Sequence, residues 1–273
     1  MSFNMKKQLQ VMKEVAYVTY KEWSAYRTHS MISIFVGPVY FIVQYFIWNA
    51  VYGAKDMLQG IALQEMIQYF GVSTLIGYLV MDFADWNLSM LIRTGKFLTF
   101  AIRPIHHRFF ALAQKVGHRM IGFLFEFLPC LIIFQCLFHV NMRPKYLGWF
   151  LVSVLLAFLM HFYAYYTMGL LSFWLVKTDG IREVFGLLSS VCSGSLIPLV
   201  FFPHWLQVIQ FFLPFQYIIY VPSMVFTGKY VLGGITFEVP QIVGIQAIAV
   251  FGAYLVSEVL YRLSMKHFTG VGA

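Results

Sequence analysis

The chain has 273 residues, of which 60% are hydrophobic and 11% charged, and its formal net charge is +8. Soluble domains carry about 25% charged residues, so this composition excludes an ordinary soluble protein and predicts an integral membrane protein. The basic residues flank the apolar segments, which favours membrane topology over nucleic-acid binding as the reason for the positive charge.

The N-terminal segment 5–29 has helical periodicity but too little hydrophobicity to cross a membrane. Apolar residues recur at three- and four-residue steps, at Leu9, Met12, Ala16, Tyr20 and Trp23, and lysines occupy the polar positions between them. This pattern predicts an amphipathic helix that lies in the membrane surface. An ordinary juxtamembrane arm is the alternative.

Five later segments are apolar enough to be membrane spans. A hydrocarbon core about 30 Å thick needs roughly 20 helical residues. The segments that meet this requirement are 31–52, 66–86, 120–138, 147–176 and 241–261. Pro38 is expected to kink the first of them, because proline lacks a backbone donor.

The interval 184–228 has no charged residue but contains four prolines, at Pro198, Pro203, Pro214 and Pro222. If it crosses the membrane once, 15 of the 19 Lys and Arg residues are cytoplasmic; two crossings would leave 14 inside. The positive-inside rule therefore favours one crossing, from Val184 to about Phe202. The remainder, 203–222, is predicted to be a re-entrant helical pair packed against the bundle on the outer side.

The sequence therefore predicts one all-α membrane domain over residues 1–273. It has six transmembrane helices, the N-terminal interfacial helix, and the re-entrant pair between spans five and six. Both termini are expected to be cytoplasmic.

The segment 87–119 is predicted to be a cytoplasmic loop. It carries six Lys and Arg residues and no acidic residue, and a short helix over 88–94 is expected to end at Thr94 and Gly95. Two interpretations stay open on physical grounds. The charge reflects membrane topology and attraction to anionic headgroups, or the segment docks onto a cytoplasmic partner.

Three acidic residues lie within apolar segments. Glu126 is near the middle of the third span, where a carboxylate is a functional hypothesis by default, although pairing with a neighbouring helix would also explain it. Asp82 and Asp85 have a spacing that would suit a magnesium-bound diphosphate. A solvated helix end, or pairing with Arg93 or Lys96, is the favoured interpretation.

Motifs for nucleotide and metal chemistry are missing from the sequence. It contains neither GxxxxGK[ST] nor HExxH, and its three cysteines lie within apolar segments. We therefore predict no catalytic residue, no metal site and no nucleotide bound by this chain.

Two stretches resemble the membrane subunits of type-2 ABC transporters, the exporter-type permeases. They are SGSLIPLVFFPHWLQVIQFFLPFQYIIYVPSMVFTG, residues 193–228, and IRTGKFLTFAIRP, residues 92–104. In that family the first stretch forms a re-entrant helical pair on the extracytoplasmic side. The second contains the short coupling helix, which docks into a separate ATPase subunit.

The resemblance implies half of a bacterial inner-membrane exporter. A second copy or a related permease would complete the pathway, and ATP-binding cassette subunits would bind ATP and Mg on the cytoplasmic side. The implied ATPase contacts are Arg93, Gly95, Lys96 and Arg103, with 177–183 as a second contact. The implied outer-gate residues are Pro198, Pro203, Trp205 and Pro214.

The expected cargo is amphipathic or lipid-linked, because the spans offer an aromatic, poorly charged lining. Two alternatives remain: a membrane enzyme acting on a lipid diphosphate through Asp82 and Asp85, and an ion-coupled carrier using Glu126.

Overall fold

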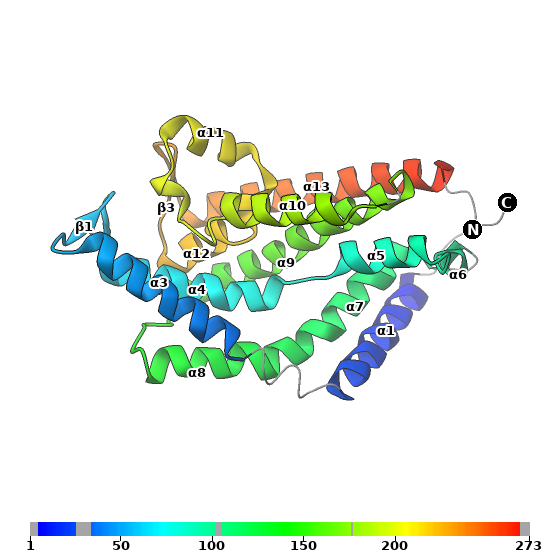
Figure 1. The fold of residues 1–273 in the computed structure, drawn as a ribbon, viewed down its shortest axis with the longest axis horizontal. Coiled ribbons are helices and arrows are strands. Elements are labelled where there is room, and N and C mark those ends of the chain that lie inside the picture. Colours follow the sequence, from blue (N-terminus) through cyan, green and yellow to red (C-terminus); the bar gives the residue numbers. More distant parts are fainter. Residues whose placement is uncertain (1–4, 26–33, 102–104, 176, 268–273) are drawn as a thin grey trace.

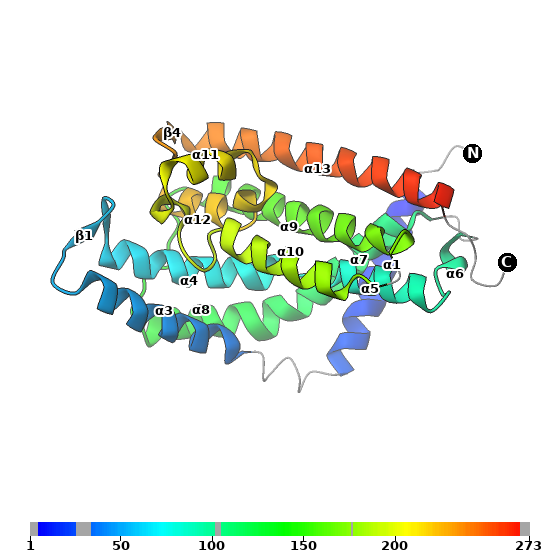
Figure 2. The ribbon, with the colours of Figure 1, turned by 45° about the horizontal axis from the view of Figure 1, so that its top comes forward.

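The computed structural model describes residues 5–25, 34–101, 105–175 and 177–267. Long helices run side by side along the molecule and form a bundle (Figures 1 and 2). The elements are α1 (Met5–Ala25), α3 (Val36–Tyr52), β1 (Met57–Leu58), β2 (Ile61–Ala62), α4 (Leu63–Val80), α5 (Ala84–Arg93), α6 (Leu98–Ala101), α7 (His107–Gly122), η1 (Phe123–Phe127), α8 (Leu128–Cys136), α9 (Leu147–Leu170), η2 (Leu171–Phe173), α10 (Asp179–Cys192), η3 (Leu199–Phe201), α11 (His204–Phe212), η4 (Pro214–Tyr217), α12 (Tyr220–Thr227), β3 (Tyr230–Leu232), β4 (Ile235–Phe237) and α13 (Val239–His267).

Within these described ranges, four helical stretches are long and apolar enough to cross a membrane. They are Leu63–Arg93, His107–Cys136, Leu147–Phe173 and Val239–Lys266. By contrast, α3 has 17 residues and α10 has 14. At 1.5 Å per residue these helices are about 26 and 21 Å long, which is less than a hydrocarbon core of about 30 Å.

The second predicted span, 66–86, is not one helix. An extended segment, Met81–Phe83, separates α4 from α5 (Figure 1). Asp82 explains the break, because its Oδ1 accepts the backbone N–H of Phe83 at 2.7 Å and that of Ala84 at 3.0 Å. A carboxylate that satisfies the free donors at a helix start favours a new helix at this point.

The third span begins earlier than predicted. A continuous helical stretch runs from His107 through α7, η1 and α8 to Cys136, so much of the predicted loop 87–119 is helix. The turn η1 is a π-helix, and such wide turns are often found at functional sites.

The predicted helix through Phe202 is wrong, because α10 ends at Cys192. Gly194 follows with φ +82, a left-handed conformation that glycine adopts without strain. The prolines then begin short helices: Pro198 and Pro203 directly precede η3 and α11, and Pro214 is the first residue of η4. Proline suits a helix start because the missing N–H would have no partner there.

The two ends of the molecule carry different elements (Figures 1 and 2). The hairpin of β1 and β2, and that of β3 and β4, lie at one end, together with α11. The elements α5 and α6 lie at the other end, near the C-terminal part of α13. An aromatic core between them includes Phe41 and Phe134, whose ring centroids are 4.5 Å apart.

The N-terminal helix α1 packs against α7, where Gly117 permits a close approach. A Cβ atom at Gly117 would collide with the backbone carbonyl of Ala16. Nearby, the rings of Trp23 and His118 have centroids 4.0 Å apart. A helix is therefore present over the described residues 5–25 of the predicted segment 5–29.

Candidate functional site

The turn between α5 and α6 forms an exposed basic tip. The helix α5 ends at Arg93 and is followed by Thr94 and by Gly95, whose φ is +70. The N–H of Phe97 donates a hydrogen bond to the carbonyl of Leu91 at 3.0 Å. Phe97 is buried, which fixes the turn to the bundle. Arg93 and Lys96 remain exposed on either side of Gly95. We call residues 93–99 the basic tip.

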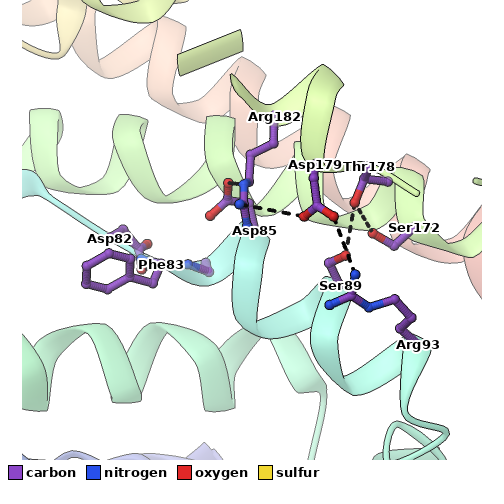
Figure 3. A network of polar contacts seen from close by, with 10 residues as sticks. Asp82, Phe83, Asp85, Ser89, Arg93, Ser172, Thr178, Asp179 and Arg182 are labelled. Carbon is purple, nitrogen blue, oxygen red and sulfur yellow. Dashed lines mark hydrogen bonds and ion pairs between the residues drawn. The ribbon is translucent and has the colours of Figure 1, made fainter. Parts of the chain in front are cut away.

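Hydroxyl groups join α5 to the start of α10 (Figure 3). Ser89 Oγ and Thr178 Oγ1 are 2.9 Å apart, and Thr178 Oγ1 also lies 3.2 Å from Ser172 Oγ. Ser89 and Thr178 are both buried. Buried hydroxyls that satisfy one another hold their helices in a defined register, because separating them would leave polar groups without partners.

A chain of ion pairs continues this connection toward the solvent (Figure 3). Arg182 Nε lies 3.8 Å from Asp85 Oδ2, and Arg182 Nη2 lies 3.7 Å from Asp179 Oδ1. The other Asp179 oxygen lies 3.4 Å from Arg93 Nη1, within the basic tip. We call the hydroxyl and ionic contacts together the α5–α10 bridge; its members are Asp85, Ser89, Arg93, Ser172, Thr178, Asp179 and Arg182.

The α5 helix also lies very close to α9. A Cβ at Gly169 would meet the Cα of Asp85 at 2.9 Å and the Cβ of Leu88 at 3.2 Å. Glycine is therefore required for this helix contact, and α5 is held between α9 and α10.

A buried ion pair lies behind the break in the second span. Lys115 Nζ on α7 is 3.6 Å from Asp82 Oδ2 and donates to the carbonyl of Phe158 at 2.9 Å. The Lys115 side chain is 0% exposed and that of Asp82 is 7% exposed. Such a pair is costly to desolvate and also costly to break by removing one partner.

Glu126 is paired within its own helical stretch. Its Oε2 lies 3.3 Å from Arg119 Nη1, which also donates to the carbonyl of Tyr78 at 2.6 Å. On the same stretch, Arg108 Nη2 lies 2.8 Å from Glu258 Oε2 on α13. Three of the six basic residues assigned to a loop therefore lie in ion pairs along α7: Arg108, Lys115 and Arg119.

The expected pairing of Asp82 or Asp85 with Arg93 or Lys96 is wrong. Asp82 pairs with Lys115 on α7 and Asp85 with Arg182 on α10, so the two carboxylates engage different helices. In the part of the chain that the structure describes, no three His, Cys, Asp or Glu side chains gather as a metal site would require.

A cavity of about 340 Å³ lies between α3, α4, α9 and α10, and we call it the central cavity. No Asp, Glu, Lys or Arg is among its lining residues. Its walls carry hydroxyl groups, from Tyr40, Thr74, Tyr165, Ser189, Ser190 and Ser195 among others. The two serines Ser189 and Ser190 belong to α10, the helix that the α5–α10 bridge holds.

The predicted outer-gate residues lie at the opposite end from the basic tip. Trp205 is 64% exposed on α11, whereas the nearby Tyr230 on β3 is buried. The Tyr230 hydroxyl donates to Gln216 Oε1 at 2.6 Å. Burial raises the pKa of the Tyr230 phenol, so it remains protonated and this contact persists.

Sequence patterns named Arg93, Asp85 and the segment 177–183 but did not predict that they contact one another. Arg103 lies outside the described residues, while 177–183 contains Thr178, Asp179 and Arg182 of the bridge. The seven-residue spacing of Arg119 and Glu126 was a readable signal, because two helical turns place both on one face. Ser89 contacts Thr178, 89 positions away, and Asp85 contacts Arg182, 97 positions away. No local sequence pattern predicts such contacts.

Comparison with known proteins identifies one family. A model described as ABC-2 family transporter protein matches residues 39–272, which include every element from most of α3 through α13. No curated protein matches the chain.

Proposed function

The chain belongs to the ABC-2 type transporter permease family, and we propose that it forms half of the translocation pathway of an ATP-driven exporter. A separate ATP-binding cassette subunit would supply ATP hydrolysis, with ATP and Mg bound there. The observation that carries this proposal is the α5–α10 bridge, which connects the exposed basic tip to a helix lining the central cavity.

The basic tip has the features of a docking surface. Arg93 and Lys96 are exposed there, and Leu98 beside them is 45% exposed. An exposed apolar residue close to two cations suits a protein surface with acidic and apolar groups. Buried Phe97 anchors the turn, so a push on the tip would move α5.

The route from the tip to the cavity uses a few contacts. Arg93 contacts Asp179 at the start of α10, and Ser89 contacts Thr178 just before it. A displacement of α5 would therefore displace α10 and change the central cavity. In this way ATP-driven movement of the partner would switch access to the pathway.

The cavity also supports the proposed cargo. Its hydroxyl and apolar lining suits an amphipathic or lipid-linked molecule that carries neutral polar groups. A second permease, either another copy or a related chain, would enclose the pathway. Exposed apolar residues on α3 and α10 support such a contact or contact with lipid; they include Val39, Phe46, Val184 and Leu187.

Six crossings of a bacterial inner membrane, with cytoplasmic termini, remain the proposed topology. The short helix α10 would complete its crossing with the irregular segment up to Pro203. Then α11 and η4 would form the re-entrant pair, with Pro198, Pro203, Trp205 and Pro214 shaping the outer gate. Gln210 and Gln216 are buried in this region, which supports shielding of irregular backbone by protein.

The interfacial role of α1 is supported by its exposed apolar side chains. Leu9, Tyr17 and Val18 are each at least 51% exposed, although α1 packs on α7. These side chains would enter the headgroup region, where the Lys21 ammonium, 4.7 Å from the centre of the Tyr17 ring, would meet lipid phosphates.

The two alternatives receive less support. A diphosphate-binding enzyme needs carboxylates free for metal, whereas Asp82 and Asp85 each lie in an ion pair. A carrier using Glu126 would need to release that carboxylate from Arg119 for each proton.

Reversing the charge of the basic tip tests the proposal. The chain is co-purified with its ATP-binding cassette partner, and ATP turnover is measured for the double variant Arg93→Glu with Lys96→Glu. We expect loss of the complex or at least a tenfold fall in turnover, because two cations become repulsive anions. Lys55→Glu, an exposed change at the opposite end, is the control. Unchanged turnover in the double variant would refute the docking assignment.

A further inference from the structure

A second cavity lies at the end of the molecule opposite the basic tip, and we call it the outer cavity. Its volume is about 190 Å³, and its walls come from the β1–β2 turn, the start of α4, η3 and the end of α12. It shares no lining residue with the central cavity. A cavity of about 150 Å³ accepts benzene, so the outer cavity has room for a small headgroup.

Two opposite charges line the outer cavity. Glu65 lies in the first turn of α4, and Lys229 follows Gly228 at the end of α12. In the described ranges neither forms an ion pair. One Glu65 oxygen accepts the backbone N–H of Ala62 at 3.2 Å, which leaves the other oxygen for a ligand.

The surroundings of Lys229 add positive charge. Gly228 has φ +78, and a Cβ there would collide with the side chain of Lys145. Lys145 therefore packs directly beside the turn that carries Lys229. Lys229 makes this side of the cavity basic, with the stem of Lys145 packed behind it outside the lining, and Glu65 makes the opposite side acidic.

The remaining wall is largely apolar. Tyr69 and Tyr220 present rings, because their hydroxyls donate to the carbonyls of Gly194 at 2.7 Å and Val231 at 2.6 Å. The other apolar lining residues are Ile61, Met66, Pro198, Val200, Met224 and Val231. A suitable ligand thus carries a cation and an anion on an apolar body.

The position of the outer cavity matches the membrane interface. Glu65 is the third residue of the candidate span that begins at Leu63, and Lys229 lies ten positions before the span that begins at Val239, which contributes no lining residue. Lipid headgroups occupy this level of a membrane.

From the charges, the apolar wall and this depth, we infer that the outer cavity binds the phosphoethanolamine headgroup of a membrane phospholipid. The primary ammonium donates to Glu65, and the phosphate lies at Lys229. A primary ammonium has N–H groups for the carboxylate, whereas the quaternary group of choline has none.

Native mass spectrometry of the purified chain tests this inference without any ATPase partner. The chain is mixed with equal amounts of phosphatidylethanolamine, phosphatidylglycerol and phosphatidylcholine. We expect one retained phosphatidylethanolamine per chain, at least tenfold more than either other lipid. Glu65→Gln should abolish the preference over phosphatidylglycerol, while keeping an acceptor for Ala62. Lys229→Gln should lower the retention of phosphatidylethanolamine, because the phosphate loses its cationic partner.

Lys55→Gln, on the connection between α3 and β1 and not among the lining residues, should leave retention unchanged. Equal retention of the three lipids by the unmodified chain would overturn the inference. So would an unchanged preference in both Glu65→Gln and Lys229→Gln. Displacement of the lipid by an equimolar amount of free O-phosphoethanolamine would identify a soluble ligand instead. Because no transport is measured, these outcomes are independent of the proposed coupling to an ATPase.

Discussion

Lys115 and Asp82 form a buried ion pair, with Nζ 3.6 Å from Oδ2, that joins α7 to the break between α4 and α5. Asp82 also fixes the start of α5, since its other oxygen accepts the N–H of Phe83 and that of Ala84, the first residue of α5. A single side chain therefore interrupts the second span, starts the next helix and binds α7.

Removing Lys115 alone should destabilise the fold strongly. Lys115→Met leaves Asp82 without its cation in a buried position, which costs about 3–5 kcal/mol. We expect a clear fall in the thermal unfolding temperature of the purified chain. Adding Asp82→Asn should recover much of the loss, because no charge remains and the amide oxygen still accepts the N–H of Phe83. Equal stability of Lys115→Met and the unmodified chain would show that the pair contributes little.

Breaking the exposed ion pairs of the α5–α10 bridge should impair coupling to the ATPase while leaving the stability of the fold nearly unchanged. Asp179→Asn removes the pairs with Arg93 and Arg182, and exposed pairs contribute about 0–1 kcal/mol each. The unfolding temperature should change little, whereas stimulation of ATP turnover by cargo should fall several-fold. Glu238→Gln, which removes an exposed acidic charge directly before α13, is the control. Full stimulation in Asp179→Asn would mean that the ion pairs do not transmit movement.

Adding one methyl group at Gly117 should displace α1 from α7. The Cβ of Gly117→Ala would collide with the Ala16 carbonyl, which is backbone and cannot rotate away. We expect faster amide hydrogen exchange along α1, measured by mass spectrometry. Gly252→Ala on α13 meets open space and should leave exchange in α1 unchanged. Identical exchange in the two variants would refute the close contact.

The basic tip should depend on the left-handed backbone of Gly95. A non-glycine residue in this conformation costs about 1–2 kcal/mol, and asparagine tolerates it best. Gly95→Ala should therefore accelerate tryptic cleavage after Lys96 more than Gly95→Asn does. Gly77→Ala, in open space and without positive φ, should leave cleavage unchanged. Slower cleavage in Gly95→Ala would contradict the assigned turn.

Hydropathy and glycine–proline chemistry predicted the helical elements better than their ends. The end of α5 at Thr94 and Gly95 was predictable, because that stop depends on local backbone preference. The early start of α7 at His107 was not. Its basic residues are characteristic of a cytoplasmic loop, yet Arg108, Lys115 and Arg119 find carboxylates on other turns and helices.

The break at Asp82 shows a second limit of sequence reasoning. The sequence shows that an aspartate within an apolar segment is unusual. It does not show that the Asp82 carboxylate accepts the N–H of Ala84, because that contact depends on the path of the chain. Its partner Lys115 is 33 positions away, and only tertiary packing selects it. The candidate site was predictable as an exposed basic turn, and the bridge to α10 was not.

We expect the interruption at Met81–Phe83 to act as a hinge in the second span. An unbroken helix bends as one rod, whereas here the torsions of three residues allow α5 to tilt while α4 keeps its contacts. Spin labels on α4 and α9 should then hold a fixed separation while labels on α4 and α5 change theirs when nucleotide is added to the assembled complex. We therefore expect the second span to move as two segments, of which the shorter, α5, leads to the basic tip.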